Sequence, residues 1–284
     1  MLYPFLQIAM SQALNLKVLQ QGQGFPILCL HGHPGSGECM GVFCEPLSRQ
    51  FLTLAPDLRG YGGSHTQEEF TMMDHLADLE RLLDQHHISR CLVLGWSLGG
   101  ILALELALRV PDRISGLILI ATSASPRSKH PPVTWQDELW TGVASILNWL
   151  QPGRPWHIEY FGKRSLYRYL IQRHHQTAYQ YLAKAALPAY LKTSGRAKRA
   201  LSQALRSGYD RHGDLKEIKC PALILAAEQD YHITLESSLM TARELEKGTW
   251  QSYANAGHLF PWEIPTQVLQ DIEGWIQSNP HLTR

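Results

Sequence analysis

The chain has 284 residues, of which 44% are hydrophobic and 18% are charged, and its formal net charge is +1. This composition excludes a globally disordered chain and leaves room for one large α/β domain. A net charge so close to zero gives by itself no reason to expect a nucleic-acid or membrane partner.

The N-terminal stretch MLYPFLQIAM (1–10) has neither the basic region nor the small-residue cleavage site of a signal peptide. The longest apolar runs are also too short to span a membrane. We therefore expect a cytoplasmic protein with no transmembrane segment, in an oligomeric state that the sequence leaves open. The five cysteines include no CxxC pair, so neither a zinc knuckle nor a disulfide framework is indicated.

Short apolar runs alternate with helical patterns along most of the chain. In chain order, strands are expected at 14–24, 26–32, the start of 51–64, 91–95, 114–122, the start of 221–230 and 250–254. The helical patterns are at 70–86, 98–110 and 265–278. This alternation predicts an α/β fold with a mostly parallel sheet, helices on both faces and antiparallel pairing at the N-terminal edge.

Residues 123–213 interrupt the alternation, because they open with prolines, contain four tryptophans and predict helices only. We therefore divide the chain into an α/β core (1–122 and 214–284) and a helical cap (123–213). The cap holds 14 Lys and Arg against 4 Asp and Glu, a net charge of +10, so the core carries −9. Such a surface is either simply solvated, or it attracts an anionic substrate, an acidic partner or an acidic surface.

The segment GWSLGG (95–100) places one serine, Ser97, between a strand pattern and a helical pattern. A serine hydroxyl becomes a nucleophile when it projects from the chain and a base takes its proton, and a sharp strand-to-helix turn makes it project. Gly95 and Gly99 stand two residues to either side, where larger side chains would clash in such a turn. We interpret Ser97 as a nucleophile; the alternative is a tight turn that is purely structural.

Five motifs resemble those of the α/β-hydrolase fold superfamily and occur in the same order. They are HGHPGS (31–36), DLRGYGGS (57–64), GWSLGG (95–100), EQD (228–230) and AGH (256–258). The resemblance runs from about residue 14 to residue 278. It implies a sheet of the eight-stranded type, a helical cap inserted after the sixth strand, and a catalytic triad in the chain order nucleophile, acid, histidine.

The resemblance also implies the partners of Ser97. Asp230 follows the predicted strand of PALILAAEQD at the position that the family uses for its acid, and Glu228, nearer the strand end, is the rival. His258, in the loop NAGHLFPWE before the last helix, matches the family's general base. Asp230 would orient His258 and stabilise its protonated form.

By the same resemblance, an oxyanion hole would be formed by the backbone amides of Leu98 and His33. Trp96, directly before the nucleophile, would narrow the acyl side of the pocket and contact substrate. Related proteins commonly carry an aromatic residue soon after HGxPGS, whereas this chain has GECMGVF. Cys39 and Met40 would therefore either border the pocket or serve packing.

The chain shows no sign of a cofactor. His31 and His33 form an HxH pair, but the resemblance places both in the oxyanion loop, so no metal is expected. The glycines of 57–64 lack GxGxxG spacing, so no nucleotide is expected either.

The sequence thus predicts a carboxylesterase-like serine hydrolase. It would cleave a small-molecule ester or related acyl bond through an acyl-enzyme, under a lid whose aromatic side chains form an apolar pocket. The substrate would be anionic if the basic cap faces the site. Three alternatives stay open: carbon–carbon bond hydrolysis of a diketone, a cofactor-free lyase or synthase reaction, and a non-catalytic binding role.

Overall fold

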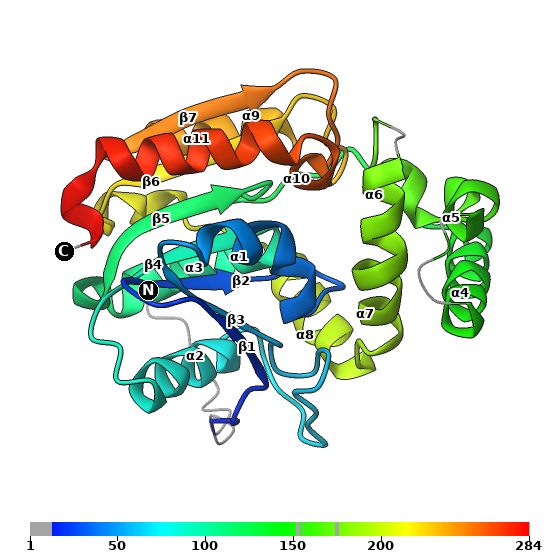
Figure 1. The fold of residues 1–284 in the computed structure, drawn as a ribbon, viewed down its shortest axis with the longest axis horizontal. Coiled ribbons are helices and arrows are strands. Elements are labelled where there is room, and N and C mark those ends of the chain that lie inside the picture. The colour runs from blue at the N-terminus through cyan, green and yellow to red at the C-terminus, as the bar shows by residue number, and fades with distance from the viewer. Residues whose placement is uncertain (1–12, 152–153, 155, 174–175, 284) are drawn as a thin grey trace.

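The computed structural model describes residues 13–151, 154, 156–173 and 176–283. Its centre is a seven-stranded sheet in the order β1-β3-β2-β4-β5-β6-β7 (Figure 1). β1 pairs antiparallel with β3, and the other neighbouring pairs of this sheet are parallel. The strands are β1 (Val18–Gln21), β2 (Pro26–Leu30), β3 (Leu52–Pro56), β4 (Cys91–Trp96), β5 (Ile114–Ile120), β6 (Ala222–Ala227) and β7 (Gly248–Tyr253).

The expected α/β fold with a mostly parallel sheet is confirmed, with a difference in strand count. Among the described residues the sheet has seven strands, one fewer than the eight-stranded type, and the helical insertion follows the fifth strand, not a sixth. The reason is that a single antiparallel strand, β1, precedes β2 in this part of the chain, so each later strand stands one place earlier in the order.

Helices cover both faces of the sheet (Figure 1). α1 (Gly41–Leu47) and α11 (Pro265–Ser278) pack on one face, and α2 (Asp74–Gln85), α3 (Leu98–Arg109) and α9 (Leu235–Glu244) pack on the other. Successive strand residues point to opposite faces. Accordingly, the side chains of each central strand divide alternately between two hydrophobic clusters, which explains why these strands read as continuous apolar runs.

The segment between β5 and β6 is helical, as expected for the insertion. Its longer elements are α4 (Trp135–Leu150), α5 (Trp156–Tyr160), α6 (Gln176–Tyr181), the π-helix η5 (Leu182–Ala186), α7 (Leu187–Leu191) and α8 (Gly195–Arg206). Figure 1 shows α6 and α7 beside the ends of the strands, with α4 and α5 farther out. The remaining short helices are η1 (Gly37–Met40), η2 (Pro111–Arg113), η3 (Gly162–Arg164), η4 (Leu166–Tyr169), η6 (His212–Glu217), α10 (Phe260–Glu263) and η7 (Pro280–Thr283).

Two buried histidines make the stability of this fold depend on pH. Burial lowers the pKa of His31 to about 4 and the pKa of His75 to about 3. An unfolded histidine titrates near pH 6.5, so below that pH the unfolded chain binds more protons than the folded one. The free energy of unfolding should therefore fall as the pH falls from about 6.5 toward 4, by about 2 kcal/mol per histidine at pH 5 relative to pH 7.5.

Urea titrations at the two pH values measure this difference. The matched variant is His75→Leu, because His75 is buried and its Nδ1 has no hydrogen-bond partner in the structure. We expect the variant to lose about half of the pH-dependent difference that these two histidines supply. An unchanged pH dependence in His75→Leu would show that this side chain is not held neutral in the folded state.

Candidate active site

Ser97 lies at the sharp turn between β4 and α3. Its backbone has φ 54° and ψ −115°, a left-handed φ that residues other than glycine rarely adopt. Two hydrogen bonds hold this conformation: the Ser97 amide donates to the Ile120 carbonyl at 2.8 Å, and the Thr122 hydroxyl donates to the Ser97 carbonyl at 2.9 Å. The turn expected from GWSLGG is therefore present, and neighbouring strand β5 and the loop after it fix its geometry.

The glycines around Ser97 permit close approach of backbone to backbone. A Cβ on Gly95 would lie 2.3 Å from the Gly99 carbonyl oxygen, across the turn. A Cβ on Gly99 would lie 2.0 Å from the carbonyl oxygen of Leu30, at the end of β2. Gly95 thus meets the steric demand inferred from the sequence, whereas Gly99 is required because α3 begins directly against the neighbouring strand.

The loop of the HGHPGS motif passes directly beside the serine. A Cβ on Gly32 would lie 2.8 Å from Cε3 of Trp96 and 3.1 Å from Cβ of Ser97. Buried His31 fixes this loop, because its Nδ1–H donates to the Gly32 carbonyl at 2.8 Å and its Nε2 accepts from the Leu58 amide at 3.0 Å. Both bonds are satisfied only by the neutral Nδ1–H tautomer, so His31 joins the HGHPGS and DLRGYGGS loops.

The amides of His33 and Leu98, predicted to form the oxyanion hole, come from this loop and from the first residue of α3. Within the described residues, neither amide donates a hydrogen bond to another backbone or side-chain acceptor. The His33 imidazole instead contacts Tyr61, with 2.8 Å between Nδ1 and the hydroxyl oxygen. Burial, with Lys198 nearby, lowers the pKa of His33 to about 4, so the ring is neutral near pH 7.

Asp230 and His258 are joined by a hydrogen bond. His258 Nδ1 lies 2.7 Å from Asp230 Oδ2, and both side chains are buried. The other carboxylate oxygen, Oδ1, accepts from the amides of His232 at 2.7 Å and Ile233 at 3.0 Å, which fixes its orientation. Glu228, the rival acid, is exposed two residues earlier. Of the two acids, Asp230 is therefore the one paired with His258.

Ser97, Asp230 and His258 all follow the carboxyl ends of strands, namely β4, β6 and β7. The indole N–H of Trp96 donates to the His258 carbonyl at 3.4 Å, which brings the loop of His258 to the residue before Ser97. Ser97 Oγ and His258, both within the described chain, form no hydrogen bond in this structure. In enzymes without substrate this contact is often long and closes when substrate binds.

His232, which the sequence analysis did not single out, stacks on His258. The two ring centroids lie 5.0 Å apart, with an angle of 21° between the planes. Burial, with His258 and His130 nearby, lowers the pKa of His232 well below its usual value. His232 is thus a neutral platform that adds no charge beside His258, and no signal in the sequence indicated this contact.

Trp96 is 5% exposed and belongs to an aromatic series that links core and insertion. Its ring meets Trp262 edge-on at 4.7 Å, and Trp262 stacks on Tyr181 of α6 at 4.1 Å. Cys39 is also buried and packs against Ala185 and Tyr181. Because the Trp96 side chain is almost fully buried, it exposes little surface to a substrate in this structure. The burial of Cys39 is explained by its packing.

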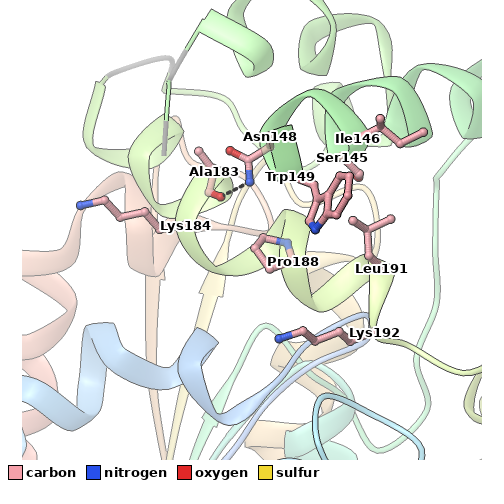
Figure 2. A pocket seen from close by; sticks show the side chains of 9 residues that line it. All are labelled: Ser145, Ile146, Asn148, Trp149, Ala183, Lys184, Pro188, Leu191 and Lys192. Atoms are coloured by element: carbon pink, nitrogen blue, oxygen red, sulfur yellow. Dashed lines mark hydrogen bonds between the residues drawn. The ribbon is translucent and has the colours of Figure 1, made fainter. Parts of the chain in front are cut away.

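The aromatic side chains of the insertion do not all line a pocket over the serine. Trp135 and Trp149 are each 72% exposed, on the outer side of α4. A cavity of about 730 Å³ does lie between α4 and α7, but no member of the predicted triad lines it (Figure 2). Trp149 lines this cavity and Trp135 does not, so an apolar lid pocket over the serine stays a prediction.

The described residues contain no cluster of three or more His, Cys, Asp or Glu side chains arranged to hold a metal ion. In the same part of the chain, no helix has both the length and the apolar character needed to cross a bilayer.

A sequence model of the family described as alpha/beta hydrolase fold matches residues 26–265, which include every loop of this site. The chain belongs to the alpha/beta hydrolase fold family. The family is thus established over most of the chain. It explains why the serine, the acid and the histidine follow the ends of three different strands.

Curated relatives of this alpha/beta hydrolase match it over shorter segments. Pimeloyl-[acyl-carrier protein] methyl ester esterase of Chromobacterium violaceum is 36% identical over 127 residues, 45% of this chain and 45% of the relative. Proline iminopeptidase of Neisseria gonorrhoeae is 34% identical over 121 residues, 40% of this chain and 38% of the relative. The chain thus spans under half the length of the curated relatives it matches.

Solved structures match the alpha/beta hydrolase over nearly its whole length. A thermophilic esterase from Thermogutta terrifontis has a TM-score of 0.70 and 26% identity, covering 95% of this chain and 94% of that one. A meta-cleavage product hydrolase from Pseudomonas fluorescens has a TM-score of 0.67 and 17% identity, covering 93% and 94%. The second likeness shows the fold alone. By their names, the two curated relatives and the Thermogutta terrifontis protein are esterases and a peptidase.

Proposed function

We propose that the protein is a serine hydrolase that cleaves a carboxylic ester or related acyl bond through an acyl-enzyme. The observation that carries the proposal is the buried 2.7 Å hydrogen bond between His258 Nδ1 and Asp230 Oδ2, at the sheet edge where Ser97 is held in a strained turn. Backbone strain of this kind persists where the surroundings enforce it, and it is common at reactive residues.

The first half of the reaction forms the acyl-enzyme. With the Nδ1 proton held by Asp230, the free lone pair of His258 is on Nε2, which takes the proton of Ser97 as Oγ attacks the carbonyl carbon. The negative charge on the carbonyl oxygen is met by the amides of Leu98 and His33, which have no other acceptor within the described chain. His258 then returns the proton to the leaving alcohol.

The second half releases the acid. Water gives a proton to His258 Nε2 and attacks the acyl carbon, the same two amides hold the oxyanion, and the proton returns to Ser97 Oγ. Asp230 remains ionised and stabilises the imidazolium each time it forms. Neutral His232 stacks on the His258 ring and stabilises its position, and it does not repel the positive charge that His258 acquires.

Residues 123–213 act in this proposal as a cap on the core formed by 1–122 and 214–284. The support is the packing of Tyr181 on Trp262 of α10, and of Ala185 and Ala189 on Cys39 of η1. Movement of these contacts would open and close the path to Ser97.

Three cap arginines already have partners, which argues against their binding the carboxylate of a diketone acid. Arg168 pairs with Asp137 at 2.9 Å, and Arg211 pairs with Glu105 at 2.7 Å. Arg173 donates to the backbone carbonyl oxygens of residues 254 and 255. Each would have to leave an existing contact to bind a substrate carboxylate.

Intact-mass labelling with a fluorophosphonate probe tests the proposal. We expect one adduct, mapped by peptide mass spectrometry to the peptide that contains Ser97. Asp230→Asn should label about 10²- to 10⁴-fold more slowly, because the amide no longer holds the correct tautomer of His258. The matched control, Glu228→Gln, changes the exposed acid two residues away and should label at the wild-type rate. An adduct elsewhere, or equal rates for Asp230→Asn and wild type, would contradict the proposal.

A further inference from the structure

Helix α4 turns its apolar side away from the protein. Along its length, large apolar residues recur at helical spacing and form one stripe. Their exposed fractions run from 49% for Leu139 to 72% for Trp135 and Trp149. The stripe consists of Trp135, Leu139, Ile146, Trp149 and Leu150. A surface helix of a globular protein normally buries such a stripe, so this orientation is the reverse of the usual one.

Polar contacts hold α4 in this orientation. Its buried side carries four polar residues, Asp137, Thr141, Ser145 and Asn148, together with Ala144. Asp137 pairs with Arg168 at 2.9 Å, and the Asn148 amide donates to the Ala183 carbonyl at 2.5 Å. The Thr141 hydroxyl accepts from the Leu166 amide at 3.2 Å. Because two separate elements, η4 and η5, bond to the polar side, the exposure of the apolar side is specified by the sequence.

A cavity of about 730 Å³ adjoins the stripe, between α4 and α7. In Figure 2, Trp149 and Leu191 lie on the same side of it as Ile146, and Lys184 and Lys192 extend at its margins. The stripe and this cavity together make an apolar surface larger than isolated exposed side chains would give. The lysines at its margin make the rim positive.

The charge around the stripe selects among possible occupants. The exposed cations near it include Arg154, just after α4, and Lys163 and Arg164 in η3, while Glu138 and Glu159 are the exposed acids of α4 and α5. The whole insertion, residues 123–213, carries +10. A second copy docked through this face would bring two such charges together, which is unfavourable. An anionic surface would be attracted.

We propose that α4 docks on the surface of an anionic lipid bilayer. The stripe would enter the boundary between headgroups and acyl chains, where tryptophan is favoured, and the surrounding lysines and arginines would face the lipid phosphates. This association is peripheral, and it does not depend on which bond the enzyme cleaves.

Co-sedimentation of the full chain with lipid vesicles tests the proposal. The two vesicle types are phosphatidylcholine alone and phosphatidylcholine with about 30% phosphatidylglycerol, each at low salt and at about 1 M salt. We expect binding to the anionic vesicles at low salt, weaker binding to the neutral ones and weaker binding at high salt. Equal binding to both vesicle types, or none to either, would overturn the proposal.

Two variants test whether lipid binding depends on the stripe or on other parts of the surface. Trp149→Ser with Leu150→Ser should lower the partition coefficient at least about tenfold, because two large side chains no longer enter the lipid. The control is Met73→Ser, an exposed apolar residue of the core, which should bind as wild type does. Unfolding temperatures monitor folding, since exposed positions contribute little to stability. Unchanged binding in the double variant overturns the proposal, as does a solution dimer that the same variant dissociates.

Discussion

Replacing Ser97 with alanine is expected to lower kcat for ester hydrolysis by about 10⁴- to 10⁶-fold, because in the proposed mechanism Ser97 Oγ forms the acyl-enzyme. The fold should be unaffected. The hydrogen bonds that hold residue 97 involve its amide and its carbonyl, which alanine retains. Steady-state kinetics on a short acyl ester measure the loss, and the unfolding temperature measures the stability.

The double variant Ser97→Ala with His258→Ala provides the control. In a triad that works as a unit, removing the second member adds little to the loss from removing the first. We therefore expect the double variant to be about as slow as Ser97→Ala alone. Turnover within tenfold of wild type in Ser97→Ala, or a full further loss in the double variant, would assign the chemistry to other residues.

The local part of this site could be predicted from the sequence. The strand before Ser97, the helix after it and the glycines between them are neighbours in the chain, so spacing and hydrophobic pattern indicate the turn directly. The family of the chain, established over residues 26–265, also agrees with the motifs at 31–36 and 256–258.

The contacts that join distant segments could not be predicted in this way. His31 bonds to the amide of Leu58, and His232 stacks on His258, yet no spacing rule relates a histidine to a partner about 27 residues away. The strand count is a different case: the hydrophobic pattern indicated seven strands, as found among the described residues, and the eight-stranded type came only from the family resemblance.

The orientation of α4 is another feature that could not be predicted from the sequence. Its apolar stripe is visible in the sequence, and the ordinary rule for amphipathic helices places such a stripe against the core. The rule fails here because the partners of its polar side, Arg168 and Ala183, come from segments 31 or more residues farther along the chain than Asp137. Only their arrangement in space shows which side of the helix is outside.

Replacing Gly99 with alanine is expected to lower the free energy of unfolding by about 4 kcal/mol or to prevent folding. The new Cβ would lie 2.0 Å from the carbonyl oxygen and 2.5 Å from the carbonyl carbon of Leu30, and these backbone atoms of β2 cannot move aside as a flexible side chain could. Urea unfolding followed by circular dichroism measures the loss.

Gly274→Ala in α11 is the matched control, because no atom outside its own helix lies within 4 Å of the added Cβ. It should stabilise the protein by about 0.5–1 kcal/mol, since alanine favours a helix interior more than glycine does. Wild-type stability in Gly99→Ala would mean that α3 can shift away from β2. Ser97→Ala should remove turnover and leave the stability unchanged, whereas Gly99→Ala should lower the stability of the fold. The two variants therefore separate the catalytic role of the turn from its structural role. Gly99 allows the helix to begin against the sheet, and Ser97 uses the position that this close approach creates.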